Sequence, residues 1–363
     1  MSRLRSLDVF RGLTVAAMVL VNSPGSDDVF APLRHAVWNG CTPTDLIFPA
    51  FLVIMGASAA FAAAAREGRG DPPAKSARRA LLRAGMLIGL GLLENEFIYR
   101  GTVGVRFPGV LQRIALCYLG VEAFLFLGRP KAEPVAAAGL LLVYWLLLMR
   151  VPVPGLGAGV LTPEGNLSYW LDRRLFPGHL MNDRWGDPEG LLATVPALAT
   201  SLLGLIAGRL LTREGSSAAR RLAAWGLGLA ALGAAWSAML PMNKHLWTSS
   251  YALFAGGLSL AGLAACLRLV EGREASWARP FEALGRRALL VYLLAGFVYG
   301  IQESVPMAVP GTDEGDLKQW LTARLFRPWL TAKAASLAYA AVYTSAMAAA
   351  ALLVAKRFDR RQQ

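Results

Sequence analysis

The sequence predicts an all-α membrane protein, a bundle of about ten transmembrane helices with both termini in the cytoplasm. Three observations lead to this prediction. Of the 363 residues, 55% are hydrophobic and only 17% are charged, whereas roughly 25% are charged in a typical soluble domain. Apolar stretches of about 20 residues, enough to cross a bilayer, recur along the chain. The loops between them alternate between short basic segments and longer ones, and we expect one membrane domain, 1–363.

The first apolar stretch, 7–21, holds two charged residues. Asp8 and Arg11 lie three positions apart, so they share one face of a helix and can form an ion pair. No small-x-small cleavage site follows the stretch, so we expect a retained helix rather than a removed signal peptide. The other predicted spans, in order, are 43–65, 80–97, 109–127, 134–149, 190–211, 222–240, 247–269, 284–303 and 333–355.

The distribution of basic residues sets the predicted orientation. With a cytoplasmic N-terminus and alternating spans, about two thirds of the 37 Lys and Arg residues fall in the inner loops, as the positive-inside rule requires. The same rule accounts for the net charge of +13 without a nucleic-acid partner. The longer loops then face outward, and polar motifs collect in or beside them; these loops are 22–42, 98–108, 150–189 and 304–332.

One of the three histidines stands out at the outer end of the second predicted span. His35 is followed by Trp38, Asn39 and Asp45. A neutral imidazole accepts a proton near pH 7, so His35 is a candidate general base that Asp45 could orient. The commoner role for such a residue is a hydrogen-bonded interfacial histidine. Asn22 closes the first span, where a helix cap is commoner than a catalytic group.

Further polar groups accompany the later spans, and each has a plain structural alternative. Glu189 could simply favour a helix N-terminus, and the turn at 243–247 could satisfy two helix ends. Arg113 lies inside a predicted span, where a bare guanidinium is costly, so we expect it to meet a carboxylate or a ligand anion, of which a structural carboxylate pair is the commoner. The candidate substrate-binding residues are Trp38, Asn39, His179, Asp187, Glu189, Asn243, Lys244 and Trp247. The cysteines at 41, 117 and 266 are too far apart in sequence to indicate a zinc site, and we expect no metal.

An ordered set of motifs resembles one known family. The segments RLRSLDVFRG, HAVWNGCTPTDLIFP, GVLQRIALCY, DPEGLLAT, NKHLWTSSY and LGRRALLVY occur in this order from residue 3 to about 292. They resemble the heparan-α-glucosaminide N-acetyltransferase family of transmembrane acyltransferases over about four fifths of the chain. The HAVWNGCTPTDLIFP block is the most specific, and the motif-bearing core is 3–300.

The resemblance implies transfer of acetyl from cytosolic acetyl-CoA to a glucosamine amine across the membrane. It implies that His35 is the catalytic histidine, that Asn22 is a functional asparagine, and that Asp45 belongs to the same site. The phosphates of acetyl-CoA would meet positive charge, for which the candidates are Arg78, Arg79, Arg83, Arg113, Arg286 and Arg287. Direct transfer with His35 as base and transfer through an acetyl-histidine both remain open.

Two departures from the eukaryotic lysosomal members bear on the acceptor. Those enzymes carry an additional lumenal domain, whereas this sequence begins at the catalytic core, and its outer loop contains Ser26, Asp27 and Asp28. We therefore expect a compact bacterial inner-membrane member that acts on an extracytoplasmic amino sugar or glycan. A homodimer is one assembly that the sequence leaves open. A multi-pass transporter or flippase of a sugar or anionic metabolite is the alternative from another class.

Overall fold

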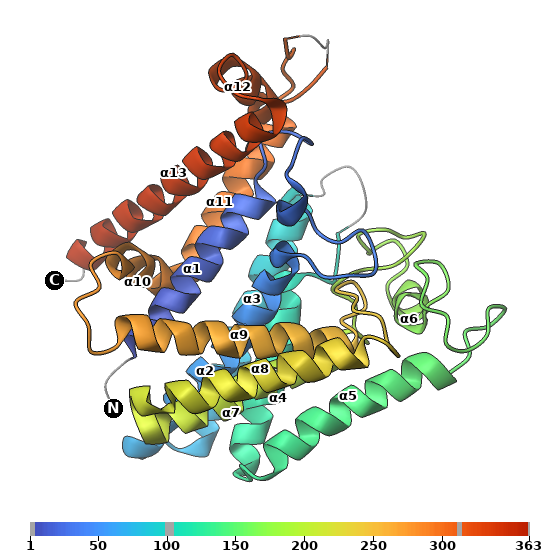
Figure 1. The fold of residues 1–363 in the computed structure, drawn as a ribbon, viewed down its shortest axis with the longest axis vertical. Helices are drawn as coiled ribbons and strands as arrows, with labels where there is room; N and C mark the ends of the chain where they lie inside the picture. Colours follow the sequence, from blue (N-terminus) through green and yellow to red (C-terminus); the bar gives the residue numbers. More distant parts are fainter. Residues whose placement is uncertain (1–3, 99–104, 311–313, 362–363) are drawn as a thin grey trace. The chain divides into compact units, whose positions relative to one another are not determined.

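The protein is built from α-helices, as the composition predicts. The computed structural model describes residues 4–98, 105–310 and 314–361, so residues 99–104 of the predicted outer loop 98–108 and 311–313 of the loop 304–332 lie outside the described residues. Every named regular element in the described part is an α-helix or a short 3-10 helix, and the α-helices are shown in Figure 1. Their bounds are α1 Arg5–Asn22, α2 Ile47–Gly68, α3 Pro73–Ile98, α4 Val110–Leu127, α5 Ala132–Arg150, α6 Leu167–Leu175, α7 Thr194–Glu214, α8 Ala219–Trp236, α9 Ser249–Val270, α10 Ala278–Arg286, α11 Ala288–Ser304, α12 Leu317–Leu325 and α13 Ala332–Arg361.

Six helical segments are long and apolar enough to cross a membrane, which makes the chain an integral membrane protein. The segment Thr194–Trp236 counts once because α7 runs into α8 through the short helix Gly215–Ala218. The bent pair α10 and α11 adds a seventh if it forms one span. Each of the ten predicted stretches overlaps a helix. Helices α1 and α3 are not among the six, and each carries several charged residues. The number of ten spans therefore stays a prediction, and so does the cytoplasmic position of the termini.

The chain divides into two compact units. The larger unit comprises Ala36–Cys41 and Phe48–Arg268, and therefore holds α3 to α8 and nearly all of α2 and α9. The smaller unit comprises the described parts of Leu4–His35, Thr42–Ile47 and Leu269–Gln363, and holds α1 and α10 to α13.

Glycines allow close helix packing in the larger unit. A Cβ added at Gly56 of α2 would lie 2.0 Å from the Ser201 carbonyl oxygen, and one at Gly204 of α7 would lie 2.2 Å from the Val53 carbonyl oxygen. Helices α8 and α9 approach in the same way, because a Cβ at Gly226 would lie 2.6 Å from the Gly257 carbonyl oxygen. Small residues at such crossings are how membrane helices gain packing contacts without a hydrophobic driving force.

We expect Gly204→Val to lower the thermal unfolding temperature of the detergent-purified protein. The new side chain would have to push α2 away from α7, and over-packing of this kind costs roughly 1–3 kcal/mol. Gly228→Val is the matched control, because a Cβ at Gly228 of α8 meets nothing within 4 Å, while the change in helix propensity is the same. Equal losses for the two variants would contradict a tight α2–α7 contact.

The smaller unit is held together at the N-terminal helix. A Cβ at Gly12 of α1 would lie 1.8 Å from the Phe281 carbonyl oxygen, and one at Gly285 of α10 would lie 1.8 Å from the Asp8 carbonyl oxygen. The predicted ion pair within α1 is confirmed, with 3.0 Å between Arg11 Nη1 and Asp8 Oδ1. Helices α1, α11 and α13 pack side by side (Figure 1).

The predicted span 284–303 is not a continuous helix. It breaks at Arg287, and α10 and α11 meet there at 82°. The glycine contact between α10 and α1 gives a physical reason, because it holds α10 along α1 rather than in line with α11.

Candidate active site

The candidate catalytic carboxylate lies at the start of the helical segment that becomes α2. Thr42 caps the 3-10 helix Pro43–Leu46, and Pro43 occupies its first turn. Asp45 Oδ2 accepts hydrogen bonds of 3.0 Å from both the backbone N–H and the hydroxyl of Thr42. This is a capping box, in which the third residue of the helix reaches back to the cap. The local sequence TPTD therefore fixes the position of the carboxylate.

His35 meets the other oxygen of this carboxylate. Its Nδ1 lies 2.7 Å from Asp45 Oδ1. Asp45 is fully buried, while the His35 side chain is 45% exposed. An ionised carboxylate only accepts hydrogen bonds, so it places the imidazole proton on Nδ1 and leaves Nε2 as the basic nitrogen.

This arrangement provides a positioned base with access to solvent. A histidine oriented by a carboxylate can take a proton from an incoming amine or hydroxyl through Nε2. The capping box fixes the Asp45 carboxylate, and this carboxylate orients His35. The orientation of His35 therefore depends on local structure between residues 35 and 45.

Asn22 belongs to the same unit. It is the last residue of α1 and is exposed. The segment that follows is tied to α11 and α13, because Tyr299 Oη donates a 3.0 Å hydrogen bond to the Pro24 carbonyl and the Ser26 N–H donates one of 3.2 Å to Ser336 Oγ. The chain between Asn22 and His35 is therefore anchored at its start.

Trp38 and Asn39 lie in the larger unit. Trp38 Nε1 donates a 2.8 Å hydrogen bond to the Leu161 carbonyl, and its ring stacks on His245 with centroids 5.2 Å apart. Asn39 Oδ1 accepts a 3.1 Å hydrogen bond from Asn243 Nδ2. The structure thus brings together Trp38, Asn39 and Asn243 from the predicted substrate-binding set.

The turn before α9 is built around Asn243 and Trp247. The side-chain oxygen of Asn243 accepts a hydrogen bond from the Leu246 N–H, and the backbone N–H of Asn243 donates one to Thr248 Oγ1. Trp247 is fully buried at a positive φ of 49°, and its Nε1 donates to Thr200 Oγ1 over 3.2 Å. Trp247 therefore supports the turn from inside, and the partly exposed Lys244 is its accessible basic residue.

Asp187 and Glu189 share one arginine. Arg106 Nε and Nη2 bind the two Asp187 oxygens at 2.8 and 2.7 Å, and Nη2 also reaches Glu189 Oε2 at 2.6 Å. Burial alone would raise the pKa of Asp187, but the Arg106 hydrogen bonds and charge lower it below its ordinary value. The arginine was not among the sequence candidates, because no motif or spacing relates it to residues 81 positions away.

His179 stabilises the same loops. Its Nδ1 lies 2.8 Å from the Val105 carbonyl oxygen, and its ring stacks on Phe107 at 4.0 Å. The Phe107 N–H donates to the His179 carbonyl over 2.9 Å. The imidazole contacts backbone and an aromatic ring, which distinguishes it from His35.

Arg113 does not form the predicted carboxylate pair with any described residue. Its Nη2 donates to the carbonyls of Pro188 and Gly190, at 2.8 and 3.3 Å, and the guanidinium lies over the Trp247 and Phe48 rings at 5.1 and 6.0 Å. Nε and Nη1 are buried without a hydrogen-bond partner in the described part of the chain. Two aromatic faces take the place of the expected counter-ion.

Asp172 of α6 is a buried acid near Arg113 that the sequence did not reveal. Its Oδ1 accepts from the Leu191 N–H at 3.0 Å, while Oδ2 is buried without a partner among the described residues. Burial, assisted by the charge of Asp187, raises its pKa from 3.8 to about 7. The side chain is therefore largely protonated below neutral pH.

We expect Asp172 to make the fold less stable as pH rises. Because its pKa is about 7 when folded and near 3.8 otherwise, the folded state binds more protons between these values, and stability falls over that window. Asp172→Asn removes this contribution. The unfolding temperature of Asp172→Asn in detergent, relative to that of the wild type, should therefore rise from pH 5 to pH 8.

The control for this experiment is Asp71→Asn. Hydrogen bonds from Lys75 and Arg69 lower the pKa of Asp71 to about 2, so this group stays ionised throughout the tested range. Parallel curves for wild type and Asp172→Asn would show that Asp172 does not titrate with the fold.

The predicted donor-binding arginines fall in both units. Arg78, Arg79, Arg83 and Arg113 lie in the larger unit, and Arg286 and Arg287 lie in the smaller one. Arg79 pairs with Asp71 at 3.1 Å, Arg83 lies over the Tyr118 ring at 4.9 Å, and Arg286 is paired with Glu282. Arg78 and Arg83 are exposed. Arg113, buried against the 188–190 loop, differs from the others in its surroundings.

Comparison with known proteins agrees with the motif order. A family model described as "Heparan-alpha-glucosaminide N-acetyltransferase, catalytic" matches residues 3–236. The chain is 28% identical over 348 residues to the human protein named "Heparan-alpha-glucosaminide N-acetyltransferase", which is 80% of this chain and 52% of the human protein. The mouse protein of that name is also 28% identical, over 349 residues. The chain thus spans about half the length of these relatives.

Proposed function

Because the chain belongs to the heparan-alpha-glucosaminide N-acetyltransferase catalytic family, we propose that it is a transmembrane acetyltransferase that carries acetyl from acetyl-CoA to the amine of an amino sugar. The single observation that carries the proposal is the buried Asp45 holding His35 at 2.7 Å, within the motif block that the family resemblance singled out. The proposed acceptor is an amino sugar or glycan on the extracytoplasmic face of a bacterial inner membrane.

The proposed reaction uses His35 as a general base. Nε2 removes a proton from the acceptor amine as its nitrogen attacks the thioester carbonyl carbon. Asn22 donates a hydrogen bond to the oxyanion of the tetrahedral intermediate. The carbon–sulfur bond then breaks, and the leaving thiolate takes the proton from His35. The products are the N-acetylated sugar and free coenzyme A, so atoms and charge balance.

Placement of the donor follows from its charge. Coenzyme A cannot cross a bilayer, so its phosphates stay at the cytoplasmic end. Arg78 and Arg83 are exposed basic side chains on the inner side in the predicted topology. Among the other candidates, Arg79 and Arg286 are paired with acids, and Arg113 donates to carbonyls of the 188–190 loop. Arg78 and Arg83 are thus the first phosphate ligands to test.

The test is acetyl transfer by the detergent-purified full chain. We expect saturable binding of acetyl-CoA in calorimetry and transfer of [14C]acetyl to glucosamine. N-acetylglucosamine is the matched acceptor without a free amine and should receive no label. If neither acetyl-CoA nor free coenzyme A binds, the acetyltransferase proposal fails and the transporter becomes the better hypothesis. Sugar movement into proteoliposomes without acetyl-CoA would establish that alternative.

Asp45→Asn tests the orienting role of the carboxylate. An amide can present its N–H₂ to Nδ1 and so stabilise the wrong imidazole tautomer, as in other histidine–aspartate pairs. We expect kcat to fall by about 10²–10⁴-fold while the KM for acetyl-CoA changes little. Asp28→Asn is the control, since the Asp28 carboxylate is exposed and its ion pair with Arg327 is long, at 3.6 Å. Equal effects of the two substitutions would contradict a positioning role for Asp45.

A further inference from the structure

The side chain of Asn22, the proposed oxyanion donor, is not fixed by contacts of its own. It is exposed, and it makes no hydrogen bond with any residue that the structure describes. Asn22 is also the last residue of α1, and helix ends fray because their last carbonyls lack partners within the helix. The position of this side chain therefore depends on the backbone that follows it, residues 23–26.

This short segment is closely packed against two helices of the smaller unit. A Cβ added at Gly25 would lie 2.3 Å from Thr322 Oγ1 of α12 and 2.8 Å from Tyr339 Cβ of α13. The Gly25 N–H donates a 3.4 Å hydrogen bond to the Ser336 carbonyl, and the Ser26 N–H donates one of 3.2 Å to Ser336 Oγ. Helices α12 and α13 thus hold the backbone just after α1.

A tyrosine of a third helix binds the same segment, and a lysine directs its proton. Tyr299 Oη of α11 donates a 3.0 Å hydrogen bond to the Pro24 carbonyl oxygen. The same oxygen accepts a 2.8 Å hydrogen bond from Lys318 Nζ of α12. An ammonium group can only donate, so the tyrosine proton cannot point toward Lys318 and is directed to Pro24. Hydrogen bonds linked in this way strengthen one another.

Lys318 is itself held in place. Its side chain is only 11% exposed, and Nζ lies 2.6 Å from Glu303 Oε1 of α11. The carboxylate of Asp316, which caps α12, lies 3.8 Å from the same nitrogen. The series of hydrogen bonds therefore begins at a fixed ammonium and ends at a carbonyl two residues after Asn22.

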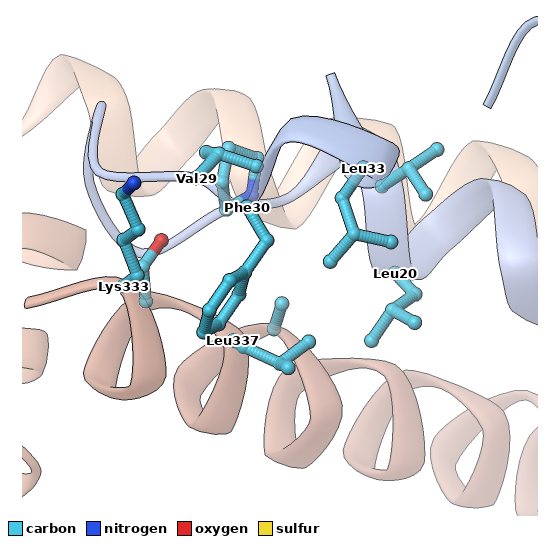
Figure 2. A pocket seen from close by; sticks show the side chains of 10 residues that line it. Leu20, Val29, Phe30, Leu33, Lys333 and Leu337 are labelled. Atoms are coloured by element: carbon cyan, nitrogen blue, oxygen red, sulfur yellow. The ribbon is translucent and has the colours of Figure 1, made fainter. Parts of the chain in front are cut away.

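The loop that continues toward His35 also contacts α13. Figure 2 shows the Phe30 ring pointing toward α13 beside Leu337, with Leu33 of the same loop farther along. These apolar contacts support the middle of the loop. The tyrosine hydrogen bond fixes its beginning, where Asn22 lies.

We propose that Tyr299 and Lys318 are positioning residues for acetyl transfer, which hold the end of α1 so that Asn22 meets the oxyanion. Both act through the Pro24 carbonyl and neither touches the substrate. Both lie beyond residues 3–236, the part of the chain that the family model matches. The inference rests on the proposed acetyltransferase function and adds two residues to its site.

Tyr299→Phe removes one hydroxyl and keeps the ring. We expect the kcat for acetyl transfer to glucosamine to fall about tenfold, because a catalytic group displaced by about 1 Å can cost up to about 10²-fold. The KM for acetyl-CoA should change little. Tyr343→Phe is the matched control, since Tyr343 packs against Tyr299 but donates its hydrogen bond to the Ala295 carbonyl. It should keep the wild-type kcat, and equal falls in the two variants would overturn the proposal.

A double-mutant cycle tests whether the tyrosine acts through Asn22. In the Asn22→Ala background no side chain is left to position, so adding Tyr299→Phe should change kcat by less than about twofold. The same loss of kcat in both backgrounds would overturn the proposal. An Asn22→Ala variant with the wild-type kcat would overturn it as well.

Lys318→Met tests the lysine in the same way. Methionine keeps an apolar stem but leaves the tyrosine hydroxyl free to turn. We expect kcat to fall severalfold in the wild-type background and to fall no further in Tyr299→Phe. An unchanged kcat in Lys318→Met would refute the role of the lysine.

Hydrogen exchange followed by mass spectrometry separates this proposal from the proposed function. In the detergent-purified full chain, peptides from 20–28 should exchange faster in Tyr299→Phe than in wild type or Tyr343→Phe, whether or not a sugar is acetylated. Unchanged exchange beside normal wild-type transfer would refute the positioning residues and leave the acetyltransferase in place. Absence of transfer by the wild type would refute the acetyltransferase, and with it any role of these residues in that reaction.

Discussion

His35→Gln should reduce the kcat for acetyl transfer by about 10²–10⁴-fold, the range that a positioned general base contributes. Glutamine is close to histidine in length and keeps a polar end near Asp45, but its amide cannot take a proton near pH 7. Binding of acetyl-CoA should persist, because His35 is proposed to act on the acceptor amine. The measurement is single-turnover transfer of [14C]acetyl together with calorimetric binding of the donor.

His179→Gln is the matched comparison. The His179 ring contacts the Val105 carbonyl and the face of Phe107, so its loss should act through the loop and change KM for the acceptor more than kcat. If both substitutions reduce kcat equally, His35 has no special chemical role. The same single-turnover reactions also test transfer through an acetyl-histidine. That intermediate would appear as labelled wild-type protein, and the His35→Gln protein would carry no label.

The sequence predicted those parts of the site that depend on local structure. His35 and Asp45 are ten positions apart in one motif, and the capping box that orients Asp45 depends on the neighbouring residues Thr42 and Pro43. The prediction that Asp45 orients His35 agrees with this geometry, while the catalytic role itself stays a prediction. The Asp8–Arg11 pair is also local to one helix, and it is confirmed.

Contacts between distant segments could not be predicted in this way. Asp172 and Arg106 acquire their roles from burial and from partners far along the chain, and nothing in their neighbouring residues indicates this. The break at Arg287 has the same origin, because no proline interrupts 284–303 and the bend accompanies packing of α10 on α1. A hydropathy pattern records the length of an apolar stretch but not the direction of the helix within it.

Arg106→Met should be the most destabilising substitution outside the membrane spans. Arg106 and Asp187 are both buried, and the arginine contributes two hydrogen bonds to that carboxylate and one to Glu189. Removing it leaves buried acid without its counter-ion, which costs roughly 3–5 kcal/mol. We expect a much lower unfolding temperature in detergent, with a smaller deficit at low pH, where the carboxylates that have lost their counter-ion can be protonated.

The double variant Arg106→Met with Asp187→Asn decides between lost charge and lost packing. The Met181 and Glu189 N–H groups bind different oxygens of Asp187, at 2.8 and 2.9 Å. Asparagine keeps an acceptor for one of the two, and it carries no charge to bury. The double variant should therefore be more stable than Arg106→Met alone, even though it has one more substitution. If the losses of stability caused by Arg106→Met and Asp187→Asn add, Arg106→Met destabilises the protein through lost packing rather than through an unpaired charge. In that case the network of Arg106, Asp187 and Glu189 would hold the loops beside Arg113 by packing, and lowering the pH would not relieve the defect.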